Sequence, residues 1–140
     1  MKRLPDWEKL LHEEIESARR KQFQWGVFDC ALFACDCVRA MTGVDPAVEF
    51  RGKYADEAGA EQMMLGKRLG KFAHSIAMAN GMPPVFSTYA RRGDLVIANN
   101  GTRDGALGIV SHHGHFAWCA AEKGLLQVPM ARWWLGWKVG

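Results

Sequence analysis

The 140-residue sequence contains no apolar run that approaches the roughly 18 residues a membrane-spanning helix requires. It also has little net charge, because 18 Lys and Arg residues nearly balance 15 Asp and Glu residues and leave a formal charge of +3. The basic residues are scattered and are not interleaved with aromatic residues on one face, as nucleic-acid binding would favour. The sequence therefore predicts no membrane span and no nucleic-acid partner.

The first ten residues, MKRLPDWEKL, carry charges where a secretory signal needs its apolar core. We therefore expect the protein to be made in a cytoplasm, where its four cysteines remain thiols and form no disulfides. The length fits a single domain, residues 1–140, built around one core.

The spacing of apolar residues divides the chain into a helical half and a half made of strands. Apolar residues recur every three or four positions in four segments, which we predict to be helices: residues 6–21, 30–41, 55–67 and 69–79. From Pro83 onward, short apolar runs alternate with turn residues and predict strands at residues 94–98, 106–110, 115–120, 125–128 and 132–139. Helices followed by an antiparallel meander predict an α+β domain.

The stretch 23–39, FQWGVFDCALFACDCVR, carries the strongest signal for chemistry. Trp25 and Gly26 predict a turn, and Asp29 stands where it would cap the helix that follows. Cys30 then lies in the first helical turn, where unpaired N–H groups and the helix dipole stabilise a thiolate. This is how a nucleophilic cysteine is usually presented.

Two other interpretations of the cysteines stay open. Cys30 falls on the same apolar face as Cys37 and Met41, so it fits a buried core thiol as well. A metal centre is the weaker alternative, because a C-x4-C-x-C run matches no zinc site and Cys35 points away from the Cys30 face. We predict no metal and no cofactor.

A catalytic cysteine needs a histidine base from a separate element. His112 and His113 fall in a predicted turn, where solvation is the usual role of a histidine. His115 begins a predicted strand, and it is the better candidate.

The order of these motifs resembles the NlpC family of papain-like cysteine peptidases. The matching pieces are Trp25–Gly26, Asp29–Cys30, Gly93–Val96 and Gly108–Ile109. The whole chain, with its W-x2-L-L helix, its MTGVDP segment and its closing W-K-V, resembles a set of small bacteriophage tail-associated NlpC-like proteins even more. The resemblance implies a papain-like fold, with the helix of Cys30 packed on the antiparallel sheet, and a place at a phage tail tip.

The chain departs from the peptidases at two positions. In the family a histidine stands two residues before the Gly-Ile pair, whereas this chain has Ala106; the residue after the nucleophile is usually Ser, whereas this chain has Ala31. Two functions therefore stay open. We favour a tail-tip or tail-assembly component, contacting other tail or hub proteins and built on a degenerate peptidase fold. The alternative is an active peptidoglycan amidase or endopeptidase, with Cys30 as nucleophile and His115 as base.

Three tryptophans gather near the C-terminus, at Trp133, Trp134 and Trp137. They cannot all face the same side of one strand, because side chains alternate between the two faces of a sheet. Burial is the usual fate of tryptophan, but one or two in such a cluster can face a partner.

Overall fold

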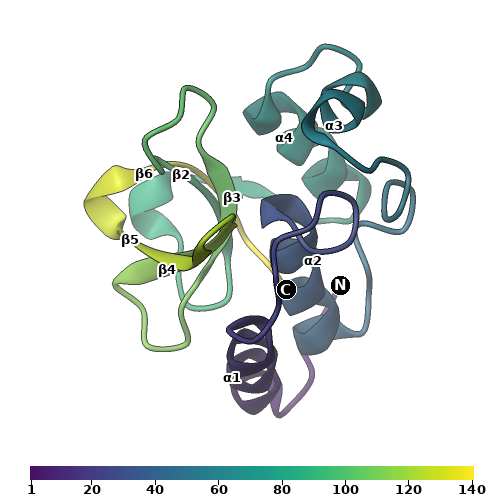
Figure 1. Cartoon of the computed structure of the whole chain (residues 1–140). Helices are drawn as coiled ribbons and strands as arrows, with labels where there is room; N and C mark the ends of the chain where they lie inside the picture. Colours follow the sequence, from purple (N-terminus) through teal and green to yellow (C-terminus); the bar gives the residue numbers. More distant parts are fainter.

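The computed structural model describes all residues, 1–140, and it shows an α+β domain with its helices first and its sheet second (Figure 1). The helices are α1 (Trp7–Ala18), α2 (Cys30–Thr42), α3 (Glu57–Met63) and α4 (Leu69–Ala79). The strands are β1 (Pro84–Val85), β2 (Leu95–Ala98), β3 (Ala106–Val110), β4 (Phe116–Ala121), β5 (Gly124–Pro129) and β6 (Trp133–Trp137). Two short 3-10 turns, η1 (Ser87–Tyr89) and η2 (Met130–Arg132), complete the chain. The predicted α+β class is confirmed.

The six strands form one antiparallel sheet in the order β1-β6-β2-β3-β4-β5. The predicted meander is confirmed only for β2 to β5, because β6 returns across the sheet to pair with β2 on one side and β1 on the other. Strand β1 was not predicted, since its two residues are too short to give an alternating pattern.

Helix α3 is shorter than the sequence pattern suggested. It begins after the Asp56 cap and ends at Met63, because Leu65 and Gly66 both adopt left-handed backbone angles, with φ of 56° and 75°. A right-handed helix cannot continue through such residues.

Helix α2 lies at the centre of the molecule, between α1 and the sheet (Figure 1). Ten of its thirteen residues are buried, so it is apolar on almost every side, as a central helix must be. The main core is a cluster of 26 buried residues that joins α1, α2 and α4 to one face of the sheet. A second cluster, of nine buried residues, covers the other face.

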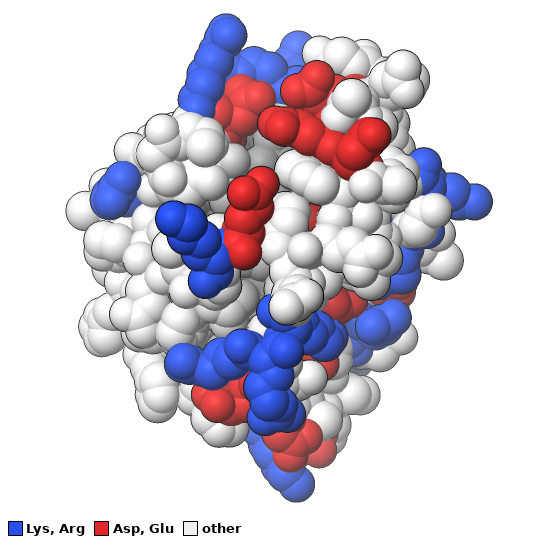
Figure 2. All heavy atoms as spheres, viewed as in Figure 1, with Lys and Arg blue, Asp and Glu red and all other residues white.

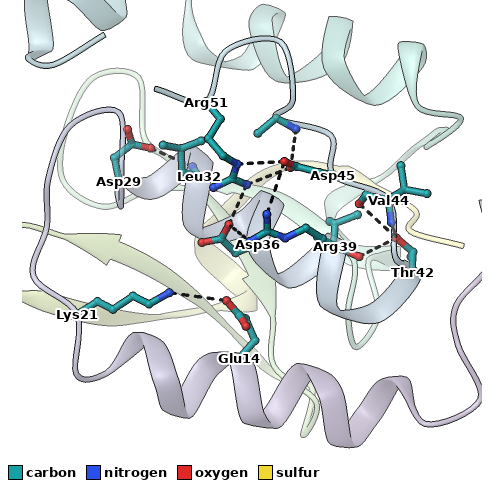
Figure 3. A network of polar contacts seen from close by, with 12 residues as sticks. Glu14, Lys21, Asp29, Leu32, Asp36, Arg39, Thr42, Val44, Asp45 and Arg51 are labelled. Atoms are coloured by element: carbon teal, nitrogen blue, oxygen red, sulfur yellow. Dashed lines mark hydrogen bonds and ion pairs between the residues drawn. The ribbon is translucent and has the colours of Figure 1, made fainter. Parts of the chain in front are cut away.

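One carboxylate, Asp36, is buried in this central helix and is held by two arginines (Figure 3). Arg51 lies 2.8 Å from the Asp36 carboxylate and 3.0 Å from that of Asp45, and Arg39 lies 3.3 Å from Asp36. Burial raises the pKa of Asp36, and the charge of Arg51 opposes that shift. These ion pairs connect Asp36 of α2 to Asp45 and Arg51, and so hold the loop after α2 against the helix.

Replacement of Arg51 by Leu is expected to destabilise the protein, because it leaves the buried Asp36 carboxylate without its nearest cation. Arg51 is partly exposed, so the loss should lie between the about 0–1 kcal/mol of surface pairs and the about 3–5 kcal/mol of fully buried ones. Urea unfolding measures the difference. Arg68→Leu, which removes the exposed pair with Asp104, is the matched control and should cost less; an equal loss in both variants would contradict this account.

Candidate functional site

The turn before α2 is organised around the buried carboxylate of Asp29, which is 1% exposed. One of its oxygens accepts the Leu32 N–H at 2.9 Å and so caps the helix, as predicted. The other oxygen accepts the Gly26 N–H at 3.1 Å and a short hydrogen bond from the Tyr54 hydroxyl. One side chain thus joins the Trp25–Gly26 turn, the helix and a later loop.

Glycine is required at position 26 for two reasons. Its φ is +80°, in the left-handed region, and a Cβ there would lie 1.8 Å from the carbonyl oxygen of Tyr54. Burial and the bond to Asp29 raise the pKa of the Tyr54 hydroxyl, which therefore stays a donor. Sequence reasoning missed Tyr54, because no local pattern links it to a carboxylate 25 residues earlier.

Cys30 is the first residue of α2, as predicted, and it is partly buried. It lies in a cleft of about 580 Å³ between the helical half and the β2–β3 loop. The cleft is bordered by residues from four places in the chain: Trp25, Met64, Asn100, Gly105, Ala106 and Ala120. Burial raises the pKa of the Cys30 thiol to about 11, while nearby backbone N–H groups of Leu107 and Ala31 oppose the shift.

No histidine borders this cleft. Ala106, which stands where the resemblance leads one to expect a histidine, lies in the same cleft as Cys30. The cleft therefore contains a thiol but lacks an imidazole that could accept its proton.

The structure does not bring His115, the predicted base, to the cleft of Cys30. His115 lies in the turn between β3 and β4 with a left-handed φ of 68°, and β4 begins after it, at Phe116. The cleft lies at the other end of β4, at Ala120 and Ala121. Five residues of extended chain separate His115 from Ala120, about 16 Å at about 3.3 Å per residue. His112 and His113 share the distant turn, where their rings lie 4.0 Å apart.

The rim of the cleft is mostly acidic. Glu57 and Glu61 of α3 border it on the helical side, and Glu122 borders it on the sheet side. Figure 2 shows acidic side chains gathered over α3 on this face. Asp104, also on the rim, is paired with Arg68 at 2.9 Å, and Arg103 is the one basic residue that borders the cleft against these acidic groups. Negative groups around a thiol disfavour the thiolate, so the rim adds no activation to Cys30.

The other cysteines are buried thiols. Cys35, Cys37 and Cys119 are free, and burial raises the pKa of each. No group of three or more His, Cys, Asp or Glu side chains is arranged to hold a metal ion. That the protein works without metal or cofactor stays a prediction.

The three C-terminal tryptophans differ in burial, as expected because they cannot all face the same side of one strand. Trp133 and Trp137 are buried, whereas Trp134 and Leu135 are each 46% exposed. A shift in the β2–β6 register at this point leaves Trp134 without a partner on β2 and allows two consecutive exposed residues. Only Trp134 among the three is available to a partner.

Residues 2–139 match a family described as a domain of unknown function, DUF6950, and the chain belongs to this family. Comparison with curated proteins gives no match. None of the helices combines the length and the apolar character that crossing a membrane demands.

Replacement of Asp29 by Ala is expected to destabilise the protein by more than the about 0.5–2 kcal/mol of an ordinary cap, because two further donors lose their acceptor. Thermal unfolding measures the loss. Asp56→Ala is the control, since Asp56 caps the exposed start of α3 through one bond to Gly59, and it should cost less. Equal losses would show that the Gly26 and Tyr54 bonds add nothing.

Proposed function

We propose that this protein is a non-catalytic binding component of a bacteriophage tail tip, built on a degenerate, papain-like fold of the NlpC type. The observation that carries the proposal is the cleft itself: Cys30 opens into it, Ala106 stands beside it, and no histidine borders it. The tail assignment comes from the resemblance of the whole chain to small tail-associated proteins. In this proposal the protein is made in the bacterial cytoplasm and then joins the virion.

The chemistry of the thiol supports binding over hydrolysis. A thiol with a pKa of about 11 is thiolate in only about one molecule in ten thousand at pH 7. The dipole of α2 offers about 0.3–1 kcal/mol, which is less than one pKa unit and cannot offset the effect of burial. An acyl-transfer reaction also needs a proton acceptor beside the sulfur, and no histidine borders the cleft.

The parts that the fold needs are all present. Asp29, Gly26 and Tyr54 form the capped turn, and α2 packs on the sheet. A recruited scaffold that has lost its catalytic base should retain these residues, because they serve stability alone. In this proposal the partners are other tail or hub proteins. The alternative, an active peptidoglycan amidase, would need a base that the cleft lacks.

Alkylation of Cys30 by iodoacetamide is expected to be slow at pH 7 and to accelerate about tenfold per pH unit, levelling off only near pH 11. The sign follows from the raised pKa, since the reactive thiolate is lost as the pH falls below it. Cys30→Ala, which leaves only the three buried cysteines, supplies the background rate. Rapid alkylation with an apparent pKa below 7 would favour the enzyme.

Phage that carry Cys30→Ala are expected to assemble and infect at the wild-type level, because the thiol takes part in no reaction. Mass spectrometry of purified particles should also detect the protein in the tail. Its absence from the particles would refute the tail assignment. Particles that assemble with Cys30→Ala but fail to cross the host wall would instead establish the peptidoglycan hydrolase.

A further inference from the structure

A second opening, separate from the Cys30 cleft, lies between α4 and the β1–β6 edge of the sheet. This groove has a volume of about 440 Å³. Its walls are largely apolar, and they include Val85, Ile97, Trp134, Leu135 and Trp137. Gly70 lets α4 approach Leu135 closely, since a Cβ at that position would lie 3.0 Å from the Leu135 side chain. The volume of about 440 Å³ is large enough for one large apolar side chain.

A histidine in this groove is fixed in one tautomer. The indole N–H of Trp137, which is 2% exposed, donates to Nδ1 of His74 at 3.2 Å. Because an indole N–H can only donate, Nδ1 must carry no proton in this bond, and the ring proton lies on Nε2. His74 itself is exposed and borders the groove, so its Nε2–H is a free donor there.

The charges along the groove favour an anion. Lys71 lies on α4, one helical turn before Ser75, and borders the groove. Its ammonium has no carboxylate partner within ion-pair distance. The one carboxylate on the rim, Asp104, is paired with Arg68 at 2.9 Å. The pair is neutral as a whole, so the unpaired ammonium of Lys71 leaves the groove with a net positive charge.

The groove also borders the free edge of the sheet. The bond from Lys138 N–H to the C=O of Pro83, just before β1, has a length of 2.8 Å and shows that the backbone groups of Pro83 and Val85 face β6. The backbone of Phe86 consequently faces away from β6, and its N–H donates to no group in the chain. An extended peptide alongside β1 would therefore meet an unpaired donor.

We propose that this groove binds the free C-terminus of a peptide chain that ends in a large apolar residue. The terminal side chain enters the pocket between Trp134 and Leu135. The carboxylate accepts from His74 Nε2–H and lies near the Lys71 ammonium, and the preceding backbone accepts from the Phe86 N–H. This site is separate from the Cys30 cleft, and the proposal holds whether or not the protein belongs to a phage tail.

Isothermal titration of the full chain with acetyl-Val-Ala-Leu, as the free acid and as the C-terminal amide, tests the proposal. The acid is expected to bind at least tenfold more tightly than the amide, because the amide lacks the charge. Equal affinities, or no binding of the acid at millimolar concentration, would overturn the proposal. Acetyl-leucine alone, which lacks the preceding backbone, should bind more weakly than the longer peptide; equal binding would instead show a site for small organic acids.

Variants of the exposed groove residues locate the site. Lys71→Gln is expected to weaken binding of the free acid about tenfold and to leave the amide unchanged. Lys67→Gln, four residues earlier, before α4 and outside the groove, is the matched control and should have no effect. His74→Glu keeps an acceptor for Trp137 but replaces the donor by a negative charge, and it should abolish binding of the acid. Unchanged binding in both groove variants would refute the site.

Discussion

The carboxylate of Asp29 determines how the start of the central helix meets the preceding turn and a later loop. It is nearly inaccessible to water, yet it accepts from the Leu32 N–H, the Gly26 N–H and the Tyr54 hydroxyl. A buried carboxylate is tolerated only when such donors replace its lost hydration. Since those donors belong to the helix, the preceding turn and a loop beyond the helix, the position of Cys30 follows from one satisfied charge. The same geometry serves a catalytic or a binding cleft, so it does not decide between them.

The balance of effects on the pKa of the thiol bears on the choice between catalysis and binding. A helix N-terminus favours the thiolate by less than one pKa unit, whereas burial shifts the pKa of Cys30 the other way, to about 11. In a cysteine peptidase an adjacent imidazole reverses this balance by taking the proton and remaining as a cation. Here the adjacent position is occupied by the methyl group of Ala106, and the acidic rim adds charges of the wrong sign. The cleft can hold a ligand, but no histidine borders it that could accept the proton of its thiol.

The sequence predicted the structure correctly where a feature depends on neighbouring residues. The Asp29 cap, the start of α2 at Cys30 and the bounds of α4 and β3 follow from neighbouring residues, and these predictions were confirmed. It failed where the cause was distant. The pairing of β6 with β2, the bond from Tyr54 to Asp29 and the separation of His115 from Cys30 depend on contacts that no local pattern encodes. The choice of His115 assumed that the start of a strand lies near the cleft, but β4 runs toward the cleft and begins at the far end.

The ion pair between Arg68 and Asp104 links the two openings of the molecule. Asp104 borders both the Cys30 cleft and the groove beside Trp134, and Arg68 also donates to the Arg103 carbonyl at 3.3 Å. The pair therefore joins the start of α4 to the β2–β3 loop at the boundary between the two spaces. Both side chains are more than 45% exposed, and such pairs contribute little to stability. The pair has a larger effect on the charge of the two openings, because it neutralises Asp104. The Cys30 cleft then has an acidic rim, whereas the groove beside Trp134 has the unpaired Lys71. The two openings thus differ in sign, so they favour ligands of different charge although they lie side by side.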